Sequence, residues 1–205
     1  PDEAVADVER VIAESGEAGE LRRELGKLYA QSGARAKYAR VLPCEVAAGK
    51  PPQRAELLLQ AAELLAAEQV FDEAFSAVEQ ALAIEPDRVE AITHRARVLA
   101  GAGRGDEAVA YLRAYLQPES RKRSNPLARV FRQLANLHLS RDELMEALEP
   151  LAHAYQLDKS DIESAYVLGL LAYDLDQFDT AANMLRVFVA VKEAAQGAER
   201  ARQLS

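Results

Sequence analysis

The sequence predicts an all-α fold built from repeated pairs of helices. Apolar residues recur at spacings of three, four and seven, which is the period of one helix face, and no segment alternates like a strand. The same pattern returns about every 34 residues, which is the mark of a repeat architecture. Single glycines and prolines separate the periodic segments, at the places where helices are expected to end.

Composition restricts the class of protein. The chain has 205 residues, 49% apolar and 28% charged, which suffices for a buried core and is unlike a disordered segment. No run of about 18 uncharged apolar residues is present, so we expect no membrane span. The net charge of −8 argues against a general nucleic-acid binder. Cys44 is the only cysteine, which excludes an internal disulfide framework and, alone, a metal site.

The clearest unit runs from Ala55 to Arg88 and reads as two amphipathic helices closed by Pro86. One apolar face is expected on each helix, formed by Leu58, Ala61, Ala62 and Leu65 on the first and by Ala74, Val78 and Ala81 on the second.

A small residue that opens the second helix marks the repeat along the chain. Equivalent positions are Ala4, Tyr38, Ala74, Ala108, Ala147 and Ala181, which are 34, 36, 34, 39 and 34 residues apart. This spacing predicts a single helical-repeat domain over 1–205, with a half repeat at 1–18, repeats at about 19–52, 55–88, 89–122, 128–161 and 162–195, and a cap or tail at 196–205.

The chain resembles the tetratricopeptide repeat family over nearly its whole length. The resemblance is carried by Leu25-Gly26-x-x-Tyr29, Leu168-Gly169, Phe71-Asp72-Glu73-Ala74, Phe178-Asp179-Thr180-Ala181 and Pro86. The chain departs from the family pattern in having no Trp, and in placing Tyr38 and Glu45 where small residues are usual. The resemblance implies a right-handed α-α superhelix of about five and a half helix pairs, whose first helices line a concave groove.

The two ends of the array are expected to be unusual. Residues 2–16 match only a second helix, so the sequence is expected to start in mid-repeat, as a piece of a longer array would. Six apolar residues make the last second helix apolar nearly all round: Met184, Leu185, Val187, Phe188, Val189 and Val191. We expect residues 192–205 to fold back over it as a cap, or else a further repeat or a second copy of the chain to cover it.

Helix starts are predicted from capping signals. Ser140-x-x-Glu143 and Ser160-x-x-Glu163 have capping-box spacing, and Asn125-Pro126 places a cap residue before a first-turn proline.

Helix interruptions are predicted from glycine and proline. Gly33 and Gly103 fall in turns within their repeats. Pro43 and Pro150 fall inside predicted second helices, where we expect a kink or a late start.

Catalytic and cofactor chemistry is not indicated. The segment 101–106 lacks the spacing of a phosphate-binding loop, and no nucleophile lies beside a plausible base. His94, His138 and His153 have no metal-ligand spacing, and His138 takes the repeat's Tyr position, which predicts a packed side chain. We therefore expect a protein that is not an enzyme and holds no metal or cofactor.

A basic groove is implied by the resemblance, since the first helices of such repeats line the binding wall. The candidate partner-binding residues are Arg23, Lys27, Arg97, Arg129, Arg132, Asn136, Tyr166 and Tyr173. Arg132 and Asn136 look like a pair with which a subset of the family grips a peptide's terminal carboxylate, although Leu59/Glu63 and Tyr166/Leu170 break the complete clamp. We expect an acidic or carboxylate-bearing segment here; alternatively, the arginines are solvated or pair with glutamates of adjacent repeats.

The 39-residue spacing implies about five extra residues near 119–124. Insertions in repeat proteins form loops, often on a binding face, so Arg121, Lys122 and Arg123 are a second candidate surface for an anionic partner. A solvated charged loop is the alternative.

The predicted function is therefore a non-catalytic scaffold that binds another protein or peptide. Two alternatives remain: a structural module that self-associates, as a homodimer, through its apolar C-terminal repeat, and an accessory domain of a larger enzyme. The usage of Ala, Arg and Leu suggests a bacterial source. No leader of charged then apolar residues follows Pro1, so the sequence leaves the compartment open, with the cytoplasm favoured over the periplasm.

Overall fold

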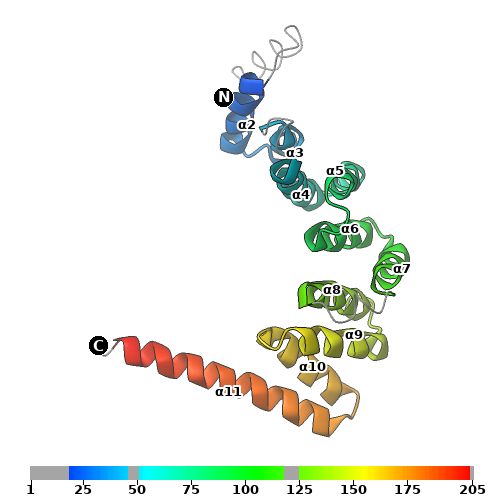
Figure 1. Ribbon diagram of the computed structural model, residues 1–205, viewed down its shortest axis with the longest axis vertical. Coiled ribbons are helices and arrows are strands. Elements are labelled where there is room, and N and C mark those ends of the chain that lie inside the picture. Colours follow the sequence, from blue (N-terminus) through cyan, green and yellow to red (C-terminus); the bar gives the residue numbers. More distant parts are fainter. Residues whose placement is uncertain (1–18, 46–50, 118–124, 204–205) are drawn as a thin grey trace. The chain divides into compact units, whose positions relative to one another are not determined.

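Helices make up the chain throughout the described residues, which are 19–45, 51–117 and 125–203 in this computed structural model (Figure 1). The chain divides into two compact units, Pro1–Ala108 and Val109–Ser205, called here the N-terminal and the C-terminal unit. The half repeat predicted at 1–18 lies outside the described residues.

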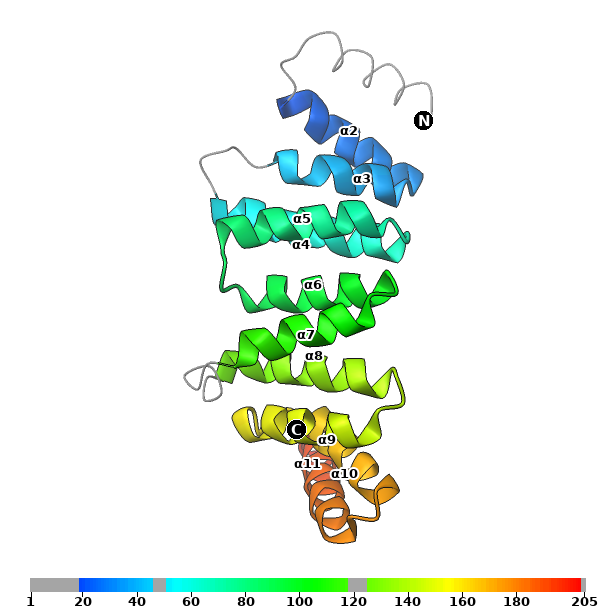
Figure 2. The same ribbon diagram turned by 90° about the vertical axis from the view of Figure 1, so that its right-hand side faces the viewer.

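The N-terminal unit stacks successive helix pairs. Its elements are α2 (Gly19–Ser32), α3 (Arg35–Val41) with the short 3-10 helix η1 (Leu42–Glu45), α4 (Pro51–Ala67), α5 (Phe71–Ile84), α6 (Val89–Gly101) and the first turn of α7 (Gly105–Leu116). Helices α4 and α5 lie side by side and form the best-packed pair of this unit (Figure 2). The predicted pairing of first and second helices is confirmed.

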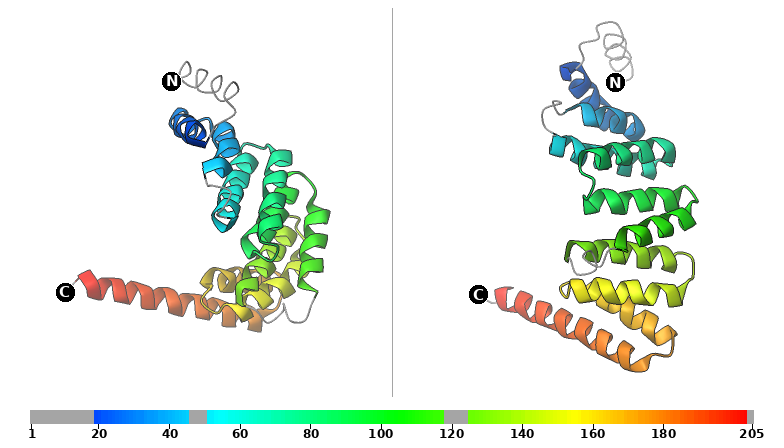
Figure 3. Two further views of the ribbon diagram at one scale, coloured as in Figure 1. Left: turned by 45° about the horizontal axis from the view of Figure 1, so that its top comes forward. Right: turned by 45° about the vertical axis from the view of Figure 1, so that its right-hand side comes forward.

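The C-terminal unit contains the remainder of α7, the 3-10 turn η3 (Asn125–Leu127), α8 (Ala128–Leu139), α9 (Leu144–Leu157), α10 (Ile162–Asp174) and α11 (Phe178–Gln203). Helix α8 pairs with α9, and α10 pairs with α11. Helix α11 is twice as long as α10, with 26 residues against 13, and projects beyond it (Figure 3). Residues 192–203 continue α11, so they do not turn back over it as a cap.

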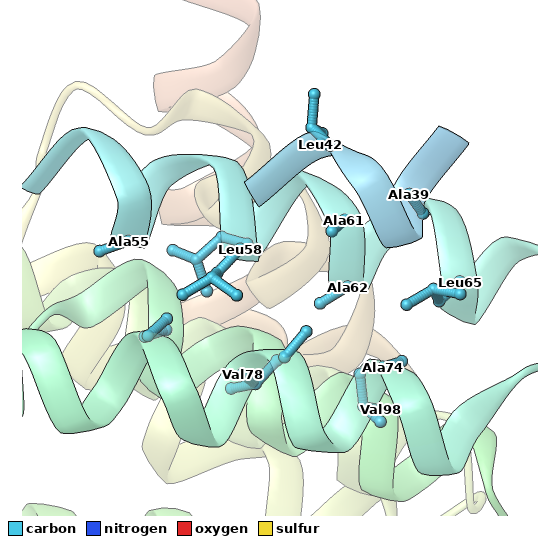
Figure 4. Close-up of a cluster of buried hydrophobic side chains, with 14 residues drawn as sticks. Ala39, Leu42, Ala55, Leu58, Ala61, Ala62, Leu65, Ala74, Val78 and Val98 are labelled. Carbon is cyan, nitrogen blue, oxygen red and sulfur yellow. The ribbon is translucent and has the colours of Figure 1, made fainter. Parts of the chain in front are cut away.

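Small apolar residues form the core between α4 and α5. Ala62 and Ala74 are fully buried and lie among the larger side chains of Leu58 and Val78 (Figure 4), and Ala81 belongs to the same buried cluster. Alanine lets the two helix backbones approach closely, and the larger side chains fill the space that remains. Each fully buried Leu or Val contributes about 1.5–3 kcal/mol relative to an exposed one.

All five described turns within repeats close in the same way. In each turn one residue has a positive φ, and the next backbone N–H donates to a carbonyl five residues earlier. These donor–acceptor pairs are Ala34 to Tyr29, Val70 to Leu65, Arg104 to Leu99, Glu143 to His138 and Gln177 to Ala172. This is the Schellman closure, which satisfies carbonyls left free at a helix end. Gly33 and Gly103 lie in these turns as predicted, with φ of 74° and 78°.

Two helix starts differ from the predicted capping boxes. Asp161 caps α10 by accepting a hydrogen bond from the Ser164 backbone N–H, while Ser160 binds Asp158 instead. Ser140 ends α8, where its hydroxyl donates to the Leu137 carbonyl at 2.8 Å. Both serines therefore form hydrogen bonds at the end of the preceding helix. The prediction of capping boxes at Ser140 and Ser160 was wrong. Asn125 and Pro126 form η3, one turn ahead of α8.

The two prolines act differently from the kink or late start expected. Helix α3 ends at Val41 and continues as the 3-10 turn η1, which contains Pro43, so the second helix of this repeat ends early. Helix α9 starts at Leu144 and runs through Pro150 to Leu157 as one helix. Pro150 has no N–H to give to the Glu146 carbonyl, so α9 loses one internal hydrogen bond there.

Candidate partner-binding site

Helices α4 and α6 of the N-terminal unit bring an arginine, a histidine and a carboxylate together. Arg97 Nη2 donates to Glu63 Oε1 at 3.2 Å, and His94 Nε2 lies 3.0 Å from the same oxygen. Beside them is a hollow of about 340 Å³, whose remaining wall is Ala62, Ala66 and Val98. The group combines two nitrogen donors with an apolar wall, as a site for an acidic side chain requires.

His94 is the least accessible member of this group, with 12% of its side chain exposed. Burial lowers the pKa of His94 below its ordinary value, and the charge of Arg97 lowers it further against the opposing effect of Glu63. The imidazole is therefore neutral at pH 7 and presents a hydrogen-bonding nitrogen rather than a second positive charge.

Helix α8 carries the two arginines of the C-terminal unit that the sequence placed in the groove. Its sequence contains Arg129 and Arg132 but no acidic residue, in a chain of net charge −8. Arg132 Nη1 donates to Asp161 Oδ2 at 2.6 Å, and this carboxylate also accepts from the hydroxyl of Ser164 at 2.7 Å. Asn136 is exposed one turn after Arg132, on the same face of the helix.

Aromatic residues lie at the corresponding positions of α10. Tyr166 and Tyr173 are 40% and 60% exposed, and Leu170 between them is also exposed. The ring of Tyr166 lies 4.7 Å from Phe188, and the ring of Tyr173 lies 5.8 Å from Phe178. Rings of α11 therefore support an apolar stripe on α10 that is accessible to solvent.

Exposed apolar residues are unevenly distributed among the described residues. Every large one lies in the C-terminal unit: Met145, Tyr166, Leu170, Tyr173, Phe178, Val189 and Val191. All but Met145 belong to α10 or α11. Apolar surface gathered in this way marks an interaction site more often than scattered residues do.

Several predicted cations form ion pairs within the chain. Besides Arg97 and Arg132, Lys27 Nζ on α2 lies 2.6 Å from Glu24 Oε1. Pairs between exposed residues contribute about 0–1 kcal/mol and are readily exchanged for a ligand. Arg23 lies on α2, but its side chain is outside the description, as are Arg121, Lys122 and Arg123 of the predicted second surface.

The alternative in which groove arginines pair with glutamates of adjacent repeats describes Arg97 and Glu63, although the sequence did not name this pair and gave His94 no part in it. Glu63 appeared only as a break in the expected clamp, whereas it holds Arg97 from the preceding repeat. Glu63 and Arg97 are 34 residues apart, which is one repeat length, and this spacing could have indicated that they lie next to each other in adjacent repeats. Other ion pairs join residues about one repeat apart as well: Arg40–Glu73, Arg88–Glu56 and Arg35–Glu68.

His138 belongs to a separate, internal network in the C-terminal unit. It is buried as predicted, with Nδ1 2.6 Å from Glu143 Oε2 and Nε2 3.3 Å from Arg113 Nη2. Because the Glu143 carboxylate accepts, Nδ1 carries the proton and Nε2 accepts from Arg113. The hydrogen bond from His138 lowers the pKa of Glu143. This network ties α7, α8 and the turn before α9 together.

Over the described ranges, no group of three or more His, Cys, Asp or Glu side chains could hold a metal ion. None of the helices in those ranges is long and apolar enough to cross a membrane.

The succession of helix pairs defines a helical-repeat protein. Residues 65–122 match the family model for the tetratricopeptide repeat. The resemblance to the tetratricopeptide repeat family inferred from the sequence is thereby confirmed. The search among curated proteins found no match.

Solved structures show the same fold. A MamA fragment from Desulfovibrio magneticus RS-1 aligns with a TM-score of 0.59 and 20% identity, covering 87% of this chain and 97% of its own. TTC0263 from Thermus thermophilus aligns at 0.53 and 21%, covering 84% and 90%. YrrB, described as a tetratricopeptide protein with an unusual peptide-binding site, aligns at 0.51 and 18%, covering 96% and 97%. Proteins of this fold are generally non-catalytic scaffolds for protein–protein interaction.

Proposed function

We propose that this chain is a non-catalytic scaffold that binds an acidic or carboxylate-bearing segment of a partner protein along its first helices. The observation that carries this proposal is the face of the C-terminal unit where α8 offers Arg129, Arg132 and Asn136, and α10 offers Tyr166 and Tyr173. The Arg97 and His94 site of the N-terminal unit supplies a second set of donors.

The electrostatics of α8 favour an anionic partner. Helix α8 carries two arginines and no carboxylate although the chain as a whole is acidic, so an anionic segment meets no repelling side chain on this helix itself. An arginine fork binds a carboxylate through charge-assisted hydrogen bonds, and Arg132 uses Nη1 for Asp161, which leaves its other N–H groups for a ligand. Binding should weaken as salt is raised, because exposed charges are screened.

The apolar stripe on α10 favours a partner segment that also carries apolar side chains. Tyr166 and Tyr173 offer large rings held in place by Phe188 and Phe178, and ordered aromatic side chains bind with a small loss of entropy. Peptide binding described for YrrB, which has the same fold, supports a partner of this kind.

The test is affinity capture from the source lysate with wild type and the double variant Arg97→Glu/Arg132→Glu, followed by mass spectrometry. A partner caught by the wild type should be lost by the variant, because two attractive contacts become repulsive. The matched control is Arg54→Glu/Arg186→Glu, which makes the same change of charge with one exposed arginine in each unit.

Both double variants must show the circular dichroism of the wild type, which excludes misfolding as the cause of lost binding. The proposal is contradicted if the Arg97→Glu/Arg132→Glu variant still captures the partner, or if the control variant loses it equally. Capture by the Arg97→Glu/Arg132→Glu variant would mean that the partner binds another face. Equal loss by the control variant would mean that the change in net charge, and not the two named arginines, abolishes binding.

Self-association through the last helix is the second candidate function. Phe178, Val189 and Val191 of α11 are between 40% and 58% exposed, and contact with a second copy of the chain would remove this apolar surface from water.

A further inference from the structure

We infer that Glu63 occupies the place of the partner's own carboxylate, at a subsite formed by Arg97 and His94, and that binding displaces it. The inference rests on the proposed function and specifies how one of its contacts is made. The ligand is a Glu or Asp side chain, or a terminal carboxylate, of the partner segment.

The geometry is that of a bound carboxylate. One oxygen, Glu63 Oε1, is held by Arg97 Nη2 at 3.2 Å and lies 3.0 Å from His94 Nε2. Both nitrogens come from one face of α6, three residues apart, while the carboxylate comes from α4. An external carboxylate that reached the same position would meet the same two nitrogens.

The hollow beside the pair shows where the external group would enter. Its volume is about 340 Å³, and Ala62, Ala66 and Val98 form its apolar wall. The aliphatic part of a Glu or Asp side chain fits against alanine methyl groups while its carboxylate reaches Arg97. A larger aromatic acid would gain little, because the wall offers only small side chains.

Displacement of Glu63 is inexpensive because the pair faces solvent. The side chains of Glu63 and Arg97 are 54% and 50% exposed, so a released Glu63 is hydrated at once. Asp161, which holds Arg132, is different: it is 15% exposed and also caps α10. Of these two arginines, Arg97 is therefore the one whose internal partner exchanges.

The experiment measures binding of acetyl-Glu-Glu-Glu-amide by NMR titration of the histidine ring signals at low salt. Glu63→Gln removes the internal competitor and should raise the affinity by about two- to fivefold, the size of an exposed ion pair. The matched control is Glu73→Gln, which removes the same charge from the neighbouring helix α5, at a residue that pairs with Arg40 instead. The His94 signals should shift on binding in the wild type and in both variants.

Equal affinities for the Glu63→Gln and Glu73→Gln variants would overturn the inference, since the gain would then come from net charge alone. Unmoved His94 signals would overturn it as well. The capture experiment tests the proposed function separately. If the Arg97→Glu/Arg132→Glu variant loses the partner while wild type and Glu63→Gln capture it equally, the proposed function stands. In that case Glu63 has no part in partner binding.

Discussion

Single residues with left-handed backbone close every described turn within a repeat. At two of the five turns the residue is glycine, and at the others it is Gln69, Asp142 or Asp176, with φ near 60°. Left-handed backbone costs an L-residue roughly 1–2 kcal/mol, and aspartate tolerates it better than glutamine does. Gln69 is therefore the most strained of the three.

Replacement of Gln69 by glycine should stabilise the protein by about 0.5–1 kcal/mol, because it removes this strain at an exposed position where no packing is lost. Gly103→Ala is the matched control and should destabilise by about 1 kcal/mol, since it creates the same strain in the equivalent turn. Urea denaturation followed by circular dichroism gives both midpoints. A lower midpoint for Gln69→Gly would contradict the strain argument.

The location of His138 could be predicted from its sequence position, but its hydrogen bonds could not. The repeat pattern places a large buried side chain there, and His138 is buried. Its partner Glu143 had been assigned to a capping box with Ser140, because the spacing of a capping box is common and a buried histidine's partner has no fixed spacing. The Glu143 carboxylate therefore binds the buried His138 ring and does not cap the helix start after Ser140.

Close packing within a repeat depends on Gly169 of α10. A Cβ added there would lie 2.8 Å from Leu185 Cγ and 3.2 Å from the Leu185 backbone N on α11. Gly169→Ala should therefore destabilise the protein by about 1–3 kcal/mol through a forced separation of α10 and α11. Thermal unfolding monitored by circular dichroism measures the change.

Gly101→Ala is the control for Gly169→Ala. Its added Cβ would meet only the ring edge of Phe71, at 2.6 Å, and a ring at the end of a side chain can rotate away. The better helix propensity of alanine offsets part of that cost, so the loss should be clearly smaller than for Gly169→Ala. Equal losses would show that contact with the α11 backbone is not the cause.

Helices were easier to predict from the sequence than their ends. The 34-residue recurrence identifies each described pair, because packing of the apolar face determines where a helix forms. The position of a helix end depends on which single side chain makes the capping hydrogen bond. At α10 this residue is Asp161 and not Ser160. Pro43 likewise ended a helix that the period alone would have continued.

On the scale of the whole molecule, the exposed apolar surface distinguishes the two units. If α11 mediates self-association, the mass measured by light scattering should rise above 22.4 kDa with concentration, and Val189→Lys/Val191→Lys should abolish the rise. Met145→Lys is the control, because Met145 is 63% exposed in the same unit but lies on α9. A mass that stays constant for the wild type would remove this candidate function.

The position of the candidate site residues on the fold was predictable in part. The sequence places Arg97, Arg132 and Tyr166 on first helices, which is where the structure has them. It did not show which carboxylates hold the two arginines, because Glu63 lies one repeat before Arg97 and Asp161 lies at the start of α10, outside the helix that carries Arg132. Contacts between repeats depend on the rotation of one helix pair on the next, which a single sequence does not specify.

The common turn closure makes the length of the array easy to change. Each hairpin is closed by hydrogen bonds within its own six-residue turn, so no hairpin needs another for its closure. Duplication or deletion of a 34-residue segment by recombination would leave every remaining turn intact and alter only the two surfaces that newly meet. A gene for such a protein can gain or lose repeats in single events, and binding faces can be recombined without a new fold.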